Sequence, residues 1–315
     1  MRKAITLMLT AGLAVAGTAV QATPEDSSQA PGYYRMPLGD FMITALSDGT
    51  VDLPMHNLLH LDAAEVHQRL AKDYLESPLE TSLNGFLIDT GDKQVLVDTG
   101  AGSMFGPTLG KLPQHLQAAG YQTNDIDVIL ITHMHPDHVG GLVRDGERLY
   151  PNAKVYVHRD DANYWLDEAH LNAAPEGQKD FFRGAMAALQ PYQESGQLSS
   201  FTGVTEILPG FVAHPTVGHT PGHSGYHVSS AEQTMVFWGD VIHVAAIQFA
   251  DPEVTIDFDT DSAVAKTVRQ GVFSSVAKEG YWAAGAHLSF PGIGHLATRD
   301  KGYRWIPANY TTQFK

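Results

Sequence analysis

The sequence predicts an α/β or mixed α+β fold, because strands and helices alternate along both halves of the chain. Two kinds of pattern support this class. Short β-branched runs such as 126–132 (IDVILIT) are typical of buried strands. Apolar residues recur at helical spacing, with charged residues between them, in 61–75. No repeat of solenoid length and no linker interrupts the chain after its leader, which favours one large domain over 23–315.

Residues 1–22 are typical of an export signal. Arg2 and Lys3 form a charged start, and 5–20 is apolar and rich in small residues. The run is short and a polar stretch follows it, so cleavage after Ala22 is favoured over a membrane anchor. We therefore expect an exported protein, periplasmic or secreted, that has no membrane association once the signal is removed.

Composition excludes several classes of protein. The 315 residues include no cysteine, so neither disulfides nor thiolate metal ligands are available. The formal charge is −15, and losing Arg2 and Lys3 with the signal makes it −17. Such a surface repels phosphate backbones and disfavours a nucleic-acid substrate. The Gly-x-Ser-x-Gly motif of serine esterases does not occur either.

The elements are expected in the following order. The first half should contain strands at 41–47, 82–89, 94–97 and 126–132, helices at 61–75 and 109–119, and turns at Asp48-Gly49 and 90–93. The second half should contain strands at 154–158, 211–217, 226–229, 234–238 and 283–291, and helices at 160–170, 179–189 and 261–278.

The stretch 133–138 (HMHPDH) places three imidazoles and a carboxylate directly after a predicted strand. Pro136 and the following Gly140-Gly141 end that strand, so the histidines fall on a loop. Imidazole and carboxylate suit Zn²⁺ and similar divalent metals, whereas a His-rich surface loop is the competing interpretation. Four donors so close in sequence cannot all reach one ion comfortably, which predicts two neighbouring ions.

Asp98 ends another predicted strand beside small residues. A carboxylate there can orient a ligand histidine through the ring nitrogen that does not bind metal. A cap of a turn or helix is the competing interpretation for this residue.

In order along the chain, HMHPDH, His219 in GHTPGH, Asp240 at a strand end and His287 resemble the metallo-β-lactamase superfamily. A closer resemblance is to the methyl parathion hydrolases and the exported lactonase- and arylesterase-like proteins around them. It is carried by the stretches LVDTGAGSMFGPTLGKL, VAAIQF, AHLSFPGIGH and KGYRWIPANY. The resemblance covers nearly the whole chain after the leader. It implies a four-layer αβ/βα sandwich with two metal ions at the edge between the sheets.

The resemblance also implies two ligand sets that share a bridging carboxylate. They are His133, His135 and His219 for one ion, Asp137, His138 and His287 for the other, and Asp240 between them. His223, the second histidine of its loop, is expected to be structural or to support a ligand. Zinc is the expected metal, with manganese, cobalt or iron as alternatives. Related proteins are often homodimers, although no stretch of this chain identifies an interface.

An aromatic substrate pocket follows from the same resemblance and would favour small apolar or aromatic esters and lactones. Its expected lining residues are Phe105, Trp165, Phe182, His243 and Phe258. His243 departs from the hydrolase pattern, which is aliphatic three residues after the bridging acid, whereas many lactonases carry a tyrosine near that position. This departure disfavours efficient phosphotriester turnover and leaves ester and lactone turnover open.

The expected reaction is hydrolysis by a hydroxide shared between two ions, which would open lactones or cleave aryl esters. Promiscuous hydrolysis of organophosphate triesters is expected as a side activity. Asp137 and Asp240 are the catalytic candidates, with Asp137 passing a proton to a poor leaving group. A dedicated organophosphorus hydrolase is the main alternative. A glyoxalase II-like thioesterase, a persulfide dioxygenase or a non-catalytic metal-binding protein ranks lower.

Overall fold

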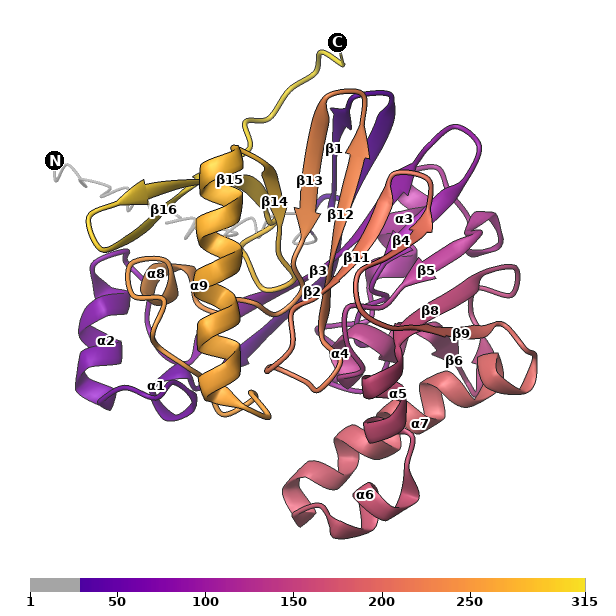
Figure 1. Cartoon of the computed structure of the whole chain (residues 1–315), viewed down its shortest axis with the longest axis horizontal. Helices are drawn as coiled ribbons and strands as arrows, with labels where there is room; N and C mark the ends of the chain where they lie inside the picture. The colour runs from indigo at the N-terminus through magenta and orange to yellow at the C-terminus, as the bar shows by residue number, and fades with distance from the viewer. Residues whose placement is uncertain (1–28, 315) are drawn as a thin grey trace, which may run out of the picture. The chain divides into compact units, whose positions relative to one another are not determined.

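Two seven-stranded mixed sheets pack against each other through a shared apolar core (Figure 1). The computed structural model describes residues 29–314, and Pro31–Lys315 form one compact unit. In spatial order the first sheet contains β1 (Tyr33–Leu38), β2 (Phe41–Leu53), β3 (Leu79–Asp89), β4 (Gln94–Val97), β5 (Val128–Leu130), β8 (Lys154–His158) and β9 (Leu198–Phe201). The second contains β10 (Thr205–Leu208), β11 (Phe211–Pro215), β12 (Ser224–Ser230), β13 (Gln233–Phe237), β14 (Trp282–Ala284), β15 (Ile293–Arg299) and β16 (Gly302–Pro307).

The central strands of each sheet are buried on both faces, as their near-continuous apolar runs predict. In β5, Val128 and Leu130 join the core between the sheets, whereas Ile129 joins the core under the helices. In β13, Phe237 faces the other sheet and Val236 faces outward. This alternation follows from the two-residue period of a strand and produces layers of helix, sheet, sheet and helix.

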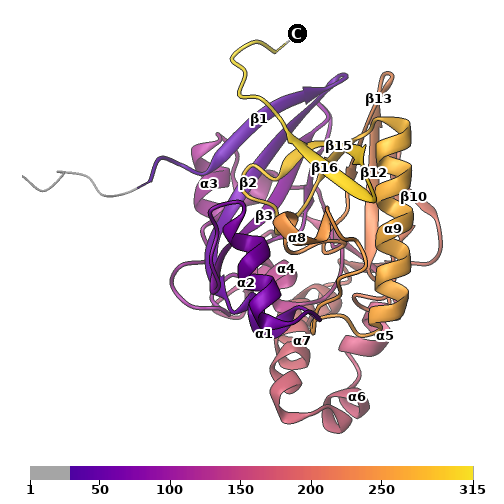
Figure 2. The same ribbon diagram turned by 90° about the vertical axis from the view of Figure 1, so that its left-hand side faces the viewer.

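Helices cover the outer face of each sheet (Figures 1 and 2). The first sheet is covered by α3 (Leu112–Ala118), α4 (Pro136–Val139), α5 (Arg159–Trp165) and α7 (Lys179–Glu194), with α6 (Glu168–Ala173) between the last two. The second is covered by α9 (Ser262–Glu279). A smaller core gathers α1 (Met55–Leu58), α2 (Ala63–Ala71) and α8 (Ala245–Gln248). Short 3-10 turns lie at Thr123–Asp125, Gly140–Leu142 and Glu176–Gln178, and a small hairpin joins β6 (Val143–Arg144) to β7 (Glu147–Arg148).

The predicted fold class is confirmed, but the turn at Asp48-Gly49 is wrong. These residues lie inside β2, where the register shifts between Ser47 and Gly49 as in a β-bulge. The bulge turns the fully buried Asp48 carboxylate inward, where it accepts hydrogen bonds from three backbone N–H groups of the 101–112 segment. An Asp-Gly pair that is typical of a turn is therefore held in a strand by distant donors.

Several element boundaries also differ from the prediction. The helix expected at 160–170 is split into α5 and α6, because Asp167 leaves the helix and caps α6 through the Ala169 N–H. The strand expected at 283–291 is only β14, so His287 lies on the loop beyond it. β1, β9, β10, β15 and β16 were not predicted.

The predicted export signal at 1–22 lies outside the described residues. Between residues 29 and 314, no helix has the length and apolar character needed to cross a bilayer.

Candidate metal centre

All seven predicted ligands lie just after strand ends. The 133–138 stretch follows β5, His219 follows β11, Asp240 follows β13 and His287 follows β14. The first of these strands belongs to one sheet and the other three to the second sheet. The predicted ligands therefore gather where the two sheets meet, as the family resemblance implies.

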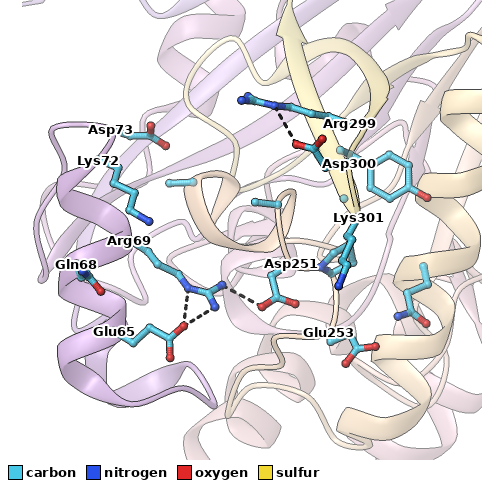
Figure 3. A pocket seen from close by; sticks show the side chains of 16 residues that line it. Glu65, Gln68, Arg69, Lys72, Asp73, Asp251, Glu253, Arg299, Asp300 and Lys301 are labelled. Atoms are coloured by element: carbon cyan, nitrogen blue, oxygen red, sulfur yellow. Dashed lines mark hydrogen bonds and ion pairs between the residues drawn. The ribbon is translucent and has the colours of Figure 1, made fainter.

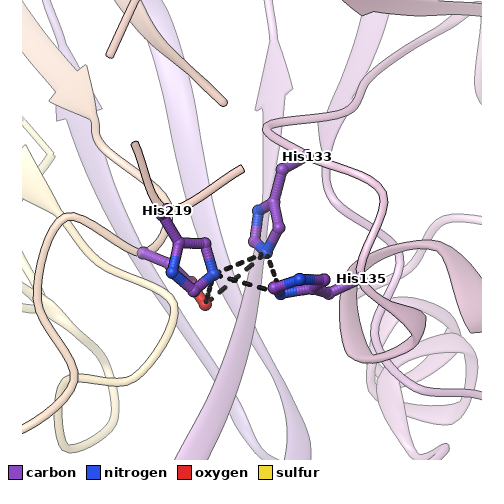
Figure 4. Close-up of side chains that lie close together, drawn as sticks. His133, His135 and His219 are labelled. Atoms are coloured by element: carbon purple, nitrogen blue, oxygen red, sulfur yellow. Dashed lines mark hydrogen bonds and ion pairs between the residues drawn. The ribbon is translucent and has the colours of Figure 1, made fainter. Parts of the chain in front are cut away.

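Three of the histidines converge on one point (Figure 4). His133 Nε2 lies 3.1 Å from His135 Nδ1, and His219 Nε2 lies 3.2 Å and 3.1 Å from these two atoms. Asp240 Oδ2 completes the group, 3.3 Å from His219 Nε2 and 3.6 Å from His133 Nε2. We refer to these four residues as the three-histidine cluster.

A second group, which we call the two-carboxylate cluster, contains Asp137, His138, His287 and the same Asp240. His138 Nε2 lies 3.2 Å from Asp240 Oδ1, and His287 Nε2 lies 3.1 Å from Asp240 Oδ2. Asp137 Oδ2 lies 3.5 Å from each of these two imidazole nitrogens. Asp240 is therefore shared between the clusters, as expected of a bridging carboxylate.

The donor atoms fit a divalent ion in each cluster. Nitrogens about 2.0–2.1 Å from a tetrahedral Zn²⁺ lie about 3.3 Å apart, close to the spacing of the three imidazole nitrogens. His138 Nε2 and Asp240 Oδ1 are buried and have no hydrogen-bond partner among the described residues. These two buried His/Asp clusters have the arrangement of a dinuclear metal centre.

Hydrogen bonds on the far side of the ring fix the tautomers of three of the predicted ligands. His138 Nδ1 donates to Asp98 Oδ2 at 2.8 Å, and His287 Nδ1 donates to the Ser82 carbonyl at 3.2 Å. His133 Nδ1 lies 3.1 Å from the Thr132 hydroxyl, which itself donates to Asp98. Each Nε2 is then left with a lone pair that faces the cluster, which is the form that binds a metal.

Asp259 was missed by the sequence analysis. Its Oδ1 lies 3.0 Å from His219 Nδ1, and its buried carboxylate also lies 3.9 Å from the buried Arg269 guanidinium. It thus supports His219 as Asp98 supports His138. No sequence spacing distinguishes Asp259 from the other acidic residues of the run 257–261. Its contact with His219 depends on how the segment before α9 is placed in the fold.

His223 supports Asp240 and does not face the clusters as a ligand. Its Nε2 accepts the Asp240 backbone N–H at 3.0 Å, and its Nδ1 donates to the Thr216 carbonyl at 3.0 Å. Burial lowers the pKa of His223 to about 3, so the ring is neutral at physiological pH. Burial also lowers the pKa of His133 and His135 well below the ordinary value, which keeps both in the neutral, metal-binding form.

A pocket of about 230 Å³ opens above the clusters. Asp137, Asp240 and His287 form part of its lining, and its apolar walls come from Val51, Leu53, Leu83, Leu109, Phe105, Phe181 and Phe258. A neighbouring pocket of about 210 Å³ shares His135, Phe181 and Phe258 with it and adds Tyr164 and Trp165. The two pockets together form an aromatic cleft beside the metal centre.

Of the five predicted pocket residues, Phe105, His243 and Phe258 line the first pocket and Trp165 lines the second. Phe182 lines neither pocket, which corrects the prediction. It is 1% exposed in the core under the first sheet, with its ring centroid 4.6 Å from that of Trp165. Its neighbour Phe181 lines both pockets instead, because successive helical residues point about 100° apart.

A larger groove of about 1290 Å³ lies elsewhere, lined by α2, the segment that follows α8 and the β15–β16 turn (Figure 3). Three of its charged residues pair within the groove: Arg69 donates to Glu65 at 2.9 Å and to Asp251 at 3.0 Å. No histidine lines it. Size alone therefore does not identify the site, whereas the chemistry of the lining residues does.

Comparisons with known proteins agree with this geometry. The model of the metallo-β-lactamase superfamily matches residues 80–276. The structure of the hydrolase AbOPH superposes with a TM-score of 0.85 at 39% identity, covering 90% of this chain and 100% of that one. The dizinc quorum-quenching lactonase AidC, solved with a product, gives a TM-score of 0.82 at 26% identity, covering 89% and 99%.

A probable metallo-hydrolase of Mycobacterium tuberculosis is 28% identical over 181 residues, which cover 50% of this chain and 56% of that protein. The chain thus matches little more than half the length of this relative. Because the family model spans more than half of the chain, and the matching structures have the same two-sheet fold, the chain belongs to the metallo-β-lactamase superfamily.

Proposed function

We propose that the protein is a metal-dependent hydrolase that opens lactones or cleaves aryl esters, with phosphotriester hydrolysis as a side activity. The observation that carries the proposal is the pair of His/Asp clusters sharing Asp240 at the bottom of an apolar, aromatic-walled pocket. A closed structural metal site would have no such pocket beside it.

The proposed ions are divalent, two per chain and zinc by preference, as in the dizinc AidC. When bound, they supply an activated water at neutral pH and a Lewis acid for the carbonyl oxygen. The proposed ligands are His133, His135 and His219 in one cluster, Asp137, His138 and His287 in the other, and Asp240 in both.

Asp137 is the carboxylate best placed to move a proton. Its side chain is 20% exposed and lines the pocket, whereas that of Asp240 is 3% exposed. We assign to the oxygen of Asp137 that would not bind metal the transfer of a proton to the leaving oxygen, whereas Asp240 would be a ligand to both ions. A phenolate of low pKa would leave without this proton.

The shape and polarity of the cleft favour a small apolar substrate. The two adjoining pockets could hold the two arms of an ester on either side of Phe181 and Phe258. Offset stacking on these rings would favour an aryl leaving group or an apolar acyl chain. AidC was solved with N-hexanoyl-L-homoserine, the product of an acyl-homoserine lactone, so lactones of this size are included.

The test is one metal-replete preparation assayed against dihydrocoumarin, acyl-homoserine lactones, an aryl acetate, a methyl phosphotriester and an acyl thioester. We expect a lactone or aryl ester to lead by at least about 10²-fold in kcat/KM, equivalent to about 2.7 kcal/mol in transition-state free energy. The thioester is included because a relative from Passalora fulva is an acyl-carrier-protein thioesterase.

Other outcomes distinguish the alternatives. A leading phosphotriester would identify a dedicated organophosphorus hydrolase, and a leading thioester would identify a thioesterase. Elemental analysis should find two ions per active chain, and hydrolysis that survives exhaustive chelation would contradict the proposal. We also propose export from the cell, which N-terminal sequencing of the mature protein would test through a start near Thr23.

A further inference from the structure

Asp161 is a buried carboxylate that belongs to neither metal cluster. It lies in the first turn of α5 and is 1% exposed. Its Oδ2 accepts the Met134 N–H and the Thr220 hydroxyl, both at 3.0 Å, and its Oδ1 accepts the Gly222 N–H at 2.6 Å. Three donors therefore satisfy a charge that would be costly to bury alone.

These donors come from the two loops that carry the histidines of the three-histidine cluster. Met134 lies between His133 and His135, on the loop after β5 of the first sheet. Thr220 directly follows His219, on the loop after β11 of the second sheet. One carboxylate thus joins two loops from different sheets.

The surroundings of Asp161 allow little adjustment. A Cβ at Gly222 would lie 2.5 Å from the Asp161 backbone nitrogen and 2.8 Å from His158 Nδ1, so only glycine permits this approach. His158 caps α5 by accepting the Asp160 N–H. The same helix carries Trp165, whose ring lies edge-on to His135 at 5.1 Å between centroids.

Asp161 is therefore connected to His135 in two ways. It binds the backbone of the loop that carries His135, and it belongs to the helix whose Trp165 packs against the His135 ring. We propose that Asp161 is a positioning residue that sets the spacing between His219 and the His133–His135 pair, and so the metal affinity of the three-histidine cluster. The inference rests on the proposed dinuclear site, and it concerns how that site is held in place.

Asp161→Asn is the direct test, because the amide keeps the shape but replaces one acceptor oxygen with a donor. At least one N–H or O–H donor then loses its partner. The matched control is Asp48→Asn, because Asp48 is equally buried and also accepts three hydrogen bonds, but from the 101–112 segment. Both variants should lose stability, and only Asp161→Asn should change metal binding.

The measurements are Co²⁺ titration followed by visible absorption, and competition with a chelator, on full-length wild type and both variants. For Asp161→Asn we expect the three-histidine cluster to bind about 10–100-fold more weakly with altered cobalt bands, as when other residues that support ligands are removed. Asp48→Asn should show wild-type spectra and affinities. The inference is overturned if the two variants lose similar stability and Asp161→Asn keeps wild-type cobalt bands and both affinities.

Thr220→Val keeps the test decisive if Asp161→Asn does not fold, because it removes only one of the three donors. It should weaken the same cluster in the same direction, and an unchanged affinity would overturn the inference. Failure of the proposed function is distinguishable, since it would show as fewer than two cobalt ions bound by the wild type.

Discussion

At the residue scale, the two His/Asp clusters depend on the groups that hold their side chains in place as much as on the cluster residues themselves. Asp98 fixes the tautomer of His138, Asp259 that of His219, and His223 the backbone of Asp240. Each of these contacts joins residues far apart in the sequence. Predictions at this scale therefore concern single side chains whose removal leaves the fold in place.

Asp259→Asn should weaken metal binding at the three-histidine cluster by about 10–100-fold, because the negative charge that holds His219 Nδ1–H is lost. Chelator competition on purified protein measures this affinity. Urea unfolding of the metal-free form serves as the control, since the change also leaves the buried Arg269 without its nearest carboxylate. Unchanged affinity would show that Asp259 stabilises only Arg269.

His243→Leu should raise phosphotriester turnover relative to lactone turnover. His243 lines the pocket, its Nε2 lies 3.2 Å from Asp240 Oδ2, and burial lowers its pKa to about 4. It is therefore a neutral ring able to donate one hydrogen bond to a carbonyl oxygen, which leucine cannot do. The ratio of kcat/KM values measures the effect at equal metal content, and an unchanged ratio would make His243 a bystander.

At the element scale, the long helices and the central strands could be predicted from signals within their own segments. Other features, such as the β-bulge in β2, depend on contacts with distant segments. Helix α9 was predicted at 261–278 and is observed at Ser262–Glu279, capped by Asp261 and ended by Gly280 with φ 67°. Its cap, its apolar face and its terminal glycine all lie within the segment. The bulge at Asp48 has no such local origin.

Asp261→Ala should lower the free energy of unfolding by about 1 kcal/mol, because the Asp261 carboxylate accepts the N–H groups of Ala263 and Val264 at the start of α9. Urea denaturation of the metal-free protein measures this change. Asp261→Ser is the control, since a serine hydroxyl can cap the same groups. Equal losses for both variants would assign the effect to something other than capping.

At the scale of the whole molecule, buried neutral histidines make stability dependent on pH. Burial, reinforced by the nearby His214, lowers the pKa of His227 to about 4, and His227 lies on β12 outside both clusters. Below pH 6.5 His227 is protonated in the unfolded chain, whereas in the folded protein it stays neutral until the pH falls to about 4. The contribution of the neutral His227 to the free energy of unfolding is therefore fully present above pH 6.5 and is lost as the pH falls toward 4.

His227→Gln should remove part of this loss. Between pH 7 and pH 5 the variant should lose about 2 kcal/mol less unfolding free energy than wild type, as an upper bound from the pKa difference. Parallel urea titrations at the two pH values, with metal removed from both proteins, give the comparison. Identical losses would show that His227 is accessible and titrates normally in the folded state.

The sequence alone predicted the fold class and, through its family resemblance, the residues of the two His/Asp clusters, because the motifs that carry both are short stretches of the chain. Strand periodicity, helix caps and the HMHPDH stretch need no distant partner to be recognised. Tertiary structure decided which groups hold the cluster residues in place: Asp259 contacts His219, and Asp161 joins two loops. It also decided that Phe181, and not Phe182, lines the pocket. These contacts arise only when segments far apart in the sequence pack together, since burial and hydrogen-bond partners between such segments have no period along the chain.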